Sequence, residues 1–374
     1  MKSSKNINIL KIYLSLIFFV FSAALWRDDM VISQMMNGIK WILLIGLIPL
    51  SIIFNNNHRI ILSSVSVLLY FFIVTIALST LLSPYLNRSG IIYLFGYISL
   101  FLIAFIFQLG DRNIVNKLLY SSLKTAVTLC LLISITQFYN INGWENGRFR
   151  GIFDNTNYLG WTSALTLIYY FHLSFKSVKV IPLIILIISI FTLWIVQSRS
   201  AYVGVVIGLL LVTSFNYHKI KLSHLLVLLL SAIYFVFFSV SGGENIQRRD
   251  FIFALDKSRS DILVTHMKLF LDNPIIGVGL SESEFGGRFP AELAYTDILS
   301  FSGVIGFSLF ISALIICSSN VINAKGMMER NNAIIFIMIL VMSIGDGYIS
   351  NIGNPLPIFA WIYMGTLARR RINE

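Results

Sequence analysis

Charged residues are scarce in this chain of 374 residues: Asp, Glu, Lys and Arg together make up 12% of it. Soluble domains usually contain roughly twice that share. Hydrophobic residues make up 57%, and the mean hydropathy is +0.81. A soluble globular protein is therefore excluded, because the excess of apolar side chains must face lipid. Only 7 Pro and 24 Gly exclude a collagen-like chain, and 30 Phe with 16 Tyr exclude a disordered one.

Cysteine and the common catalytic motifs are also scarce or missing. The two cysteines, Cys130 and Cys317, both lie in apolar runs, which predicts small buried hydrophobic residues rather than a disulfide or metal ligands. The sequence has no P-loop, no His-Glu-x-x-His and no Gly-x-Ser-x-Gly. We therefore expect neither a bound metal nor a cofactor.

Long apolar runs dominate the chain instead. About twelve of them are long enough to cross a bilayer as helices, in which every backbone amide is bonded within the segment. The sequence thus predicts an all-α polytopic membrane protein with about 12 transmembrane helices, forming a single integral membrane domain over residues 1–374. The first run follows basic residues but is long, so we interpret it as a retained anchor rather than a cleaved signal. The predicted spans lie near residues 9–25, 39–54, 60–82, 91–109, 118–138, 158–175, 180–196, 201–215, 225–240, 294–317, 333–350 and 355–368.

The positive charges are distributed unevenly over the loops. Lys and Arg are more frequent in the alternate loops that share a side with both termini than in the short loops opposite, which predicts that both termini are cytoplasmic. The terminal run Arg369–Arg371 is then a stop at the cytoplasmic face. The formal net charge of +11 is explained by this topology, so the lipid bilayer is an expected partner and nucleic acid is not.

Residues 241–293 form the one loop between predicted spans that is large enough for a lid or a site. Within this outer loop, residues 258–272 have apolar positions at helical spacing, and Asn273-Pro274 ends the pattern. Arg259 and His266 are seven residues apart and share a face of that helix. Gly277-Val278-Gly279 predicts a tight turn after it. The alternative interpretation is a helix that lies at the membrane interface with a solvated polar side.

Two short outer segments carry arginines against the charge bias. The loop 142–157 contains Arg148 and Arg150 before an Asn-rich turn, and the turn Gln197–Ser200 contains Arg199 between two predicted spans. An arginine at this depth either snorkels to the interface as an anchor or binds an anion. Because guanidinium groups bind phosphate oxygens bidentately, several of them could hold a pyrophosphate at the outer leaflet.

Four segments of the sequence, in order along residues 147–306, resemble the O-antigen polymerase and ligase superfamily of the bacterial envelope. The twelve-span layout agrees with it over the whole length. The segments are GRFRGIFDNTNYLG at 147–160, SRSAYVGVVIG at 198–208, SRSDILVTHMKLFLDNPIIGVG at 258–279 and ELAYTDILSFSGVIG at 292–306.

The resemblance implies a GT-C-like, metal-independent glycosyltransferase at the outer face of the bacterial cytoplasmic membrane. Its donor would be an oligosaccharide linked through pyrophosphate to undecaprenol, and a chain-length regulator is a candidate partner. Carried over by position, Arg199 and Arg259 match family arginines that would neutralise the leaving pyrophosphate. Arg148 matches the earlier loop arginine, with Arg150 as a close substitute.

The position of the family's ligase histidine, eleven residues before Gly303, is occupied here by Glu292. This departure favours a Wzy-type polymerase of O-antigen or capsule repeat units over a ligase that transfers glycan to lipid A core. A carboxylate can act as a base, so Glu292 is the predicted catalytic residue. The alternative is a carboxylate that stabilises the start of the next span. His266 is a second candidate base or acceptor contact, its alternative being a solvated helix residue.

A flippase or secondary transporter is the competing function of another class. It would require ionisable residues deep within the spans and an internal repeat. Lys124 and His172 are the main intramembrane candidates, Asp346 lies near the end of a predicted span, and the sequence shows no repeat. The ionisable residues instead cluster outside the spans, which favours chemistry at the membrane surface.

Overall fold

The computed structural model describes residues 2–27, 30–54, 63–84, 86–145, 147–175, 179–216, 257–280, 293–322 and 324–368. Nearly all regular structure in these residues is helical, as predicted. The ninth predicted span, at 225–240, lies outside the described residues, and so do residues 241–256 and 281–292 of the predicted outer loop, which include Glu292. A short 3₁₀ turn, Ile141–Gly143, and a hairpin of two short strands, β1 (Trp144–Glu145) and β2 (Arg148–Phe149), are the exceptions.

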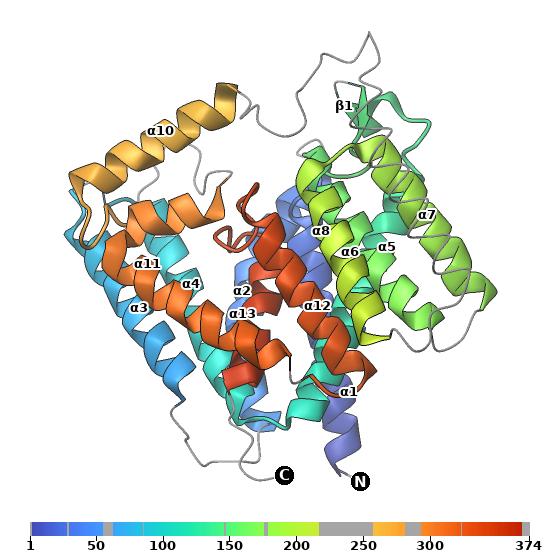
Figure 1. The fold of residues 1–374 in the computed structure, drawn as a ribbon, viewed down its shortest axis with the longest axis horizontal. Coiled ribbons are helices and arrows are strands. Elements are labelled where there is room, and N and C mark those ends of the chain that lie inside the picture. The colour runs from blue at the N-terminus through green and yellow to red at the C-terminus, as the bar shows by residue number, and fades with distance from the viewer. Residues whose placement is uncertain are drawn as a thin grey trace.

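Each predicted span within the described residues contains a helix (Figure 1). The helices are α1 (Lys2–Ala23), α2 (Val31–Phe54), α3 (Ser64–Leu82), α4 (Arg88–Leu109), α5 (Arg112–Ile135), α6 (Thr156–Ser174), α7 (Val180–Val196), α8 (Arg199–Phe215), α10 (Lys257–Asp272), α11 (Ala294–Val321), α12 (Met327–Met342) and α13 (Pro355–Ala368).

Among the described residues, five helices are long and apolar enough to cross a membrane, namely α2 to α5 and α11. Four shorter apolar segments lie in α1, α7, α8 and α13. These helices support a multi-pass membrane protein, and the count of twelve spans stays a prediction. One boundary was wrong: the span expected at 333–350 ends as a helix at Met342. The following segment, Ser343–Asn354, contains three glycines and folds as a series of turns.

Several helices begin at polar caps that the sequence supplies. The side chain of Ser63 accepts a hydrogen bond from the backbone N–H of Ser66 at the start of α3. Asn87 caps α4 in the same way, and Asp111 caps α5. Each cap satisfies an N–H group that the helix itself leaves without a partner. The caps therefore fix where these helices start.

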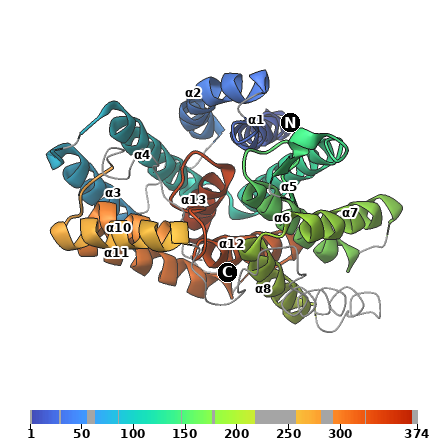
Figure 2. The same ribbon diagram turned by 90° about the horizontal axis from the view of Figure 1, so that it is seen from above.

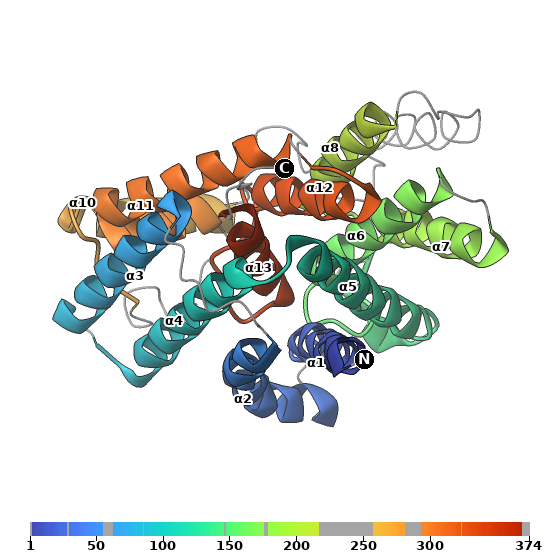
Figure 3. The ribbon, with the colours of Figure 1, turned by 90° about the horizontal axis from the view of Figure 1, so that it is seen from below.

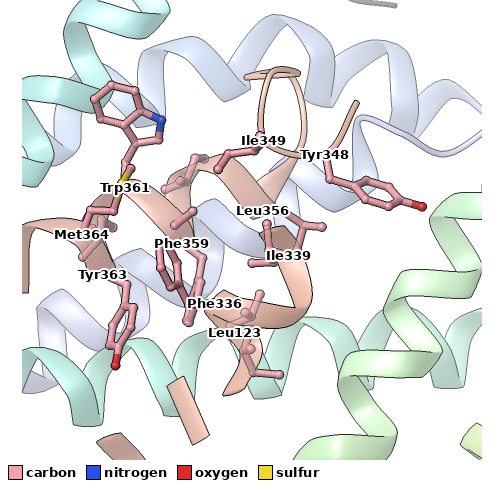
Figure 4. Close-up of a cluster of buried hydrophobic side chains, with 14 of the residues drawn as sticks. Leu123, Phe336, Ile339, Tyr348, Ile349, Leu356, Phe359, Trp361, Tyr363 and Met364 are labelled. Atoms are coloured by element: carbon pink, nitrogen blue, oxygen red, sulfur yellow. The ribbon is translucent and has the colours of Figure 1, made fainter. Parts of the chain in front are cut away.

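Helix α13 lies at the centre of the bundle (Figures 2 and 3). It packs against α3, α4, α5, α11 and α12, and each of its residues is buried. Figure 4 shows Phe359, Trp361 and Tyr363 of α13 in one cluster with Phe336 of α12 and Leu123 of α5. A helix that is apolar all round is expected to be enclosed by others, because no face of it prefers water.

The two ends of the bundle differ. The start of α1 and the end of α13 lie at one end in Figure 1, whereas α10 and the β1–β2 hairpin lie at the other. We call the second the hairpin end.

The two ionisable residues predicted to lie deep within spans, His172 and Lys124, each lie beside other protein groups. His172 Nδ1 lies 3.2 Å from Oδ1 of Asn331. Lys124 lies over the rings of Tyr120 and Tyr170, at 5.2 and 5.8 Å from their centroids. Both residues that the transporter hypothesis requires thus have local partners. Cys130 and Cys317 are free and buried, as predicted.

Helix α11 is broken at Gly303, and a distant segment fills the break. Gly303 has φ 63°, outside the helical region. The N–H groups of Val304 and Ile305 donate to the carbonyls of Pro274 and Ile275, at 2.8 and 3.2 Å. In the other direction, Gly279 donates to Phe301 at 3.1 Å. Backbone groups freed inside a membrane protein need such partners, so the break pins the segment after α10 to α11.

Gly303→Ala is expected to destabilise the protein strongly. A Cβ at position 303 would lie 2.3 Å from the carbonyl oxygen of Ile275, and a positive φ is strained for alanine. The two effects together cost about 3 kcal/mol, which a lower melting midpoint in detergent would show. Gly147→Ala is the matched control, since Gly147 has φ 74° but nothing within 4 Å of its added Cβ. Equal losses in the two variants would contradict the steric argument.

Candidate functional site

The β1–β2 hairpin is anchored into the hairpin end of the bundle by its aromatic side chains. Arg148 of β2 pairs with Glu145 of β1, and Phe149 pairs with Trp144. Phe149 and Phe153 are fully buried in a cluster with residues of α1, α5, α6 and α7. Because side chains alternate along a strand, burial of Phe149 turns Arg148 away from that cluster.

Arg148 binds the turn that precedes Arg199. Its Nε donates to the carbonyl of Val196 and its Nη2 donates to the carbonyl of Gln197, both at 3.0 Å. These are the last carbonyls of α7, which carry the negative end of the helix dipole. Gln197 has φ 55°, and α8 begins at Arg199. The structure thus bonds Arg148 to the turn that precedes Arg199, about fifty positions away in the sequence.

The turn at Arg199 is packed tightly against α6. A Cβ at Gly160 would lie 2.5 Å from Cβ of Ser198, so a side chain at position 160 would displace the turn. Arg199 itself is partly exposed at the first position of α8. A helix N-terminus and an arginine both favour an anion at that place.

Arg150 serves its own loop instead. Its Nε donates to the carbonyl of Asn142 at 3.2 Å and its Nη1 donates to the carbonyl of Asp154 at 3.3 Å. Nη1 also lies 3.9 Å from the carboxylate of Glu145. The structure therefore distinguishes the two neighbouring arginines, and Arg148 is the one that reaches the Arg199 turn.

Asp346 adds a carboxylate beside this turn. The Ser200 hydroxyl donates to Oδ2 of Asp346, and Nδ2 of Asn157 donates to Oδ1 at 3.1 Å. Asp346 is buried, and the hydroxyl of Tyr348 lies 3.3 Å from that of Ser200. Burial, and then the charge of Asp346, raise the pKa of Tyr348 well above its usual value. From the sequence, Asp346 was identified only as an ionisable residue near the end of a predicted span.

His266 is buried against α11, so the alternative interpretation of it as a solvated helix residue was wrong. Its exposed fraction is 2%. Nδ1 lies 3.1 Å from Oγ of Ser300 and 3.4 Å from Oδ1 of Asp297. Burial lowers the pKa of His266 to about 4, although a backbone hydrogen bond at Thr296 opposes the shift. The imidazole is therefore neutral at pH 7. Asp297, a fully buried acid, was missed because its pairing depends on a residue from another helix.

The remaining predicted site residues are less fully described. Arg259 belongs to α10, at the hairpin end of the bundle, but its side chain lies outside the described residues. Glu292 lies outside them altogether. Among the residues that are described, no group of three or more His, Cys, Asp or Glu side chains could hold a metal ion.

A segment that contains Arg199, Arg259 and His266 matches a known family. Residues 184–311 match the family model described as O-antigen ligase. The match runs from α7 through the Arg199 turn and α10 into α11. It covers about a third of the chain and supports the O-antigen polymerase and ligase superfamily, without distinguishing the two activities. No curated protein matches the chain.

Proposed function

We propose that this protein is a glycosyltransferase that polymerises oligosaccharide repeat units from an undecaprenyl-pyrophosphate donor at the outer face of the cytoplasmic membrane. The observation that carries the proposal is the contact of Arg148 with the turn at Arg199. This contact ties the loop of Arg148 to the turn from which α8 and Arg199 follow. The family match over the same turn supports the class of substrate.

The roles follow from the needs of the reaction. Transfer from a pyrophosphate donor requires charge stabilisation on the leaving group and a base for the attacking hydroxyl. Arg148, Arg199 and Arg259 bind the pyrophosphate, and Glu292 accepts the proton of the acceptor. Guanidinium groups then supply the positive charge, so the reaction needs no metal. Arg150 supports this arrangement by holding the hairpin loop.

A ligase that transfers a finished glycan to lipid A core is the second candidate, because the matching family is described as O-antigen ligase. The acceptor separates the two activities. Glu292 at the position of the ligase histidine favours the polymerase.

Deletion of the gene, followed by electrophoresis of the surface glycan, tests the proposal. Loss of a polymerase is expected to remove the ladder of long chains and leave one repeat unit on the acceptor lipid. Loss of a ligase would leave the acceptor lipid bare while lipid-linked chains accumulate. If the deletion strain and the strain complemented with the intact gene both keep the wild-type ladder, both functions are contradicted.

A further inference from the structure

Helix α10 is held to the bundle by very few buried side chains. Among its described side chains only His266 and Leu269 are buried, whereas Val264 and Leu271 are 51% and 67% exposed. The helix lies along α11 (Figures 1 and 2) and packs against it. The side-chain contacts of His266 therefore add to the backbone hydrogen bonds that hold the following segment, 274–279, to α11.

These contacts continue beyond α11. His266 meets Ser300 and Asp297 in the first half of α11, before the break at Gly303. The other carboxylate oxygen of Asp297 accepts a hydrogen bond from the Ser350 hydroxyl at 2.9 Å. One fully buried acid thus joins α10 to the 343–354 segment. We call His266, Asp297, Ser300 and Ser350 the α10 anchor.

The anchor connects the two parts of the proposed site. Ser350 lies four residues after Asp346, which contacts Ser200 next to Arg199. On the other side, Arg259 lies two helical turns before His266, about 10 Å along the helix axis. The imidazole faces α11 and is buried, so the geometry points to a contact between helices rather than to a group that meets a substrate.

We propose that His266 and Asp297 are positioning residues. They hold α10 in the position along α11 at which Arg259 and Arg199 can bind the same donor molecule. This inference rests on the proposed function. In this proposal His266 holds α10 in place and does not act as a base. Asp297 and Ser350 complete the contacts that hold it.

The test compares His266→Ala with His266→Asn in the full-length protein reconstituted in lipid vesicles. The probe is the undecaprenyl-pyrophosphate-linked repeat unit extracted from the source organism. With the anchor lost, the KM for this donor is expected to rise by about tenfold or more in His266→Ala, while kcat changes little. An asparagine amide reaches the position of Nδ1 but cannot act as a base, so His266→Asn is expected to restore most of the loss. Met267→Ala, at an exposed position on the same helix, is the matched control.

Hydrogen exchange supplies a readout that does not depend on activity. Amides of α10 are expected to exchange faster in His266→Ala and in Ser350→Ala, with α4 and α13 unchanged. Unchanged exchange in α10 would overturn the anchor. A loss of kcat at constant KM, not rescued by asparagine, would also overturn it and identify His266 as a base. If the wild-type protein does not consume the donor, the proposed function is wrong. The hydrogen-exchange measurement would still test the α10 anchor in that case.

Discussion

Arg199→Ala is expected to abolish long-chain polysaccharide while the amount of protein in the membrane stays unchanged. Removal of a group that stabilises charge on the leaving group costs about 10²- to 10³-fold in rate. The arginine stands at the first position of α8, where a positive charge opposes the helix dipole, so its loss should not unfold the helix. The measurement is the glycan ladder of a deletion strain complemented with the variant, with protein quantified by immunoblot. Arg259→Ala is expected to give the same phenotype.

Arg88→Ala is the matched control for Arg199→Ala. Arg88 is also the first residue of a helix, α4, and is exposed, yet no role in the site is assigned to it. Its variant should keep a normal ladder. Arg199→Lys is expected to retain only part of the activity, because an ammonium group cannot bind phosphate bidentately. A normal ladder in both Arg199→Ala and Arg259→Ala would refute the pyrophosphate role.

Glu292→Gln is expected to lower kcat by about 10²- to 10⁴-fold, the usual contribution of a general base. The amide keeps the shape of the side chain but removes its basicity, so the KM for the donor should stay near that of the wild type. Initial rates of polymer formation in vesicles measure both quantities. Asp272→Asn, which neutralises an exposed carboxylate at the end of α10, serves as the control.

Asp346→Asn distinguishes the other carboxylate near the arginines. Asp346 contacts Ser200 and Asn157, so its variant is expected to raise the KM for the donor by loosening the Arg199 turn. If Glu292→Gln keeps the wild-type rate while Asp346→Asn loses kcat, the assignment of the base to Glu292 is wrong.

The helices were predictable because a membrane imposes a simple rule on the sequence. Each crossing needs a long apolar run, and such runs overlap every described helix except α10. Helix α10 was predicted instead from the helical spacing of its apolar positions at 258–272. Turns were predictable where special conformations require particular residues. Gly277 and Gly279 have positive φ as expected, at 77° and 79°. The hairpin could have been found as well, since Asn146-Gly147 is a typical hairpin dipeptide.

The pairing of distant residues could not be predicted from local patterns. Arg148 and Arg199 were expected to be near each other because both are arginines in outer loops and both match positions in the family that the sequence resembles. The structure bonds Arg148 to the carbonyls of Val196 and Gln197, in the turn that precedes Arg199. The burial of His266 depends on Asp297 and Ser300, which follow it by about thirty residues. Nothing in the helical periodicity of α10 identifies which polar residue its inner face will meet.

The central place of α13 affects how the chain can assemble. Helices leave the ribosome in sequence order, yet α13, which α3, α4, α5, α11 and α12 surround, is the last of the described helices. The earlier helices are therefore inserted into the bilayer before α13 is available to pack between them. A polypeptide that stops before Pro355 would lack this central helix, and quality-control proteases would act on a loosely associated set of helices rather than on a folded protein.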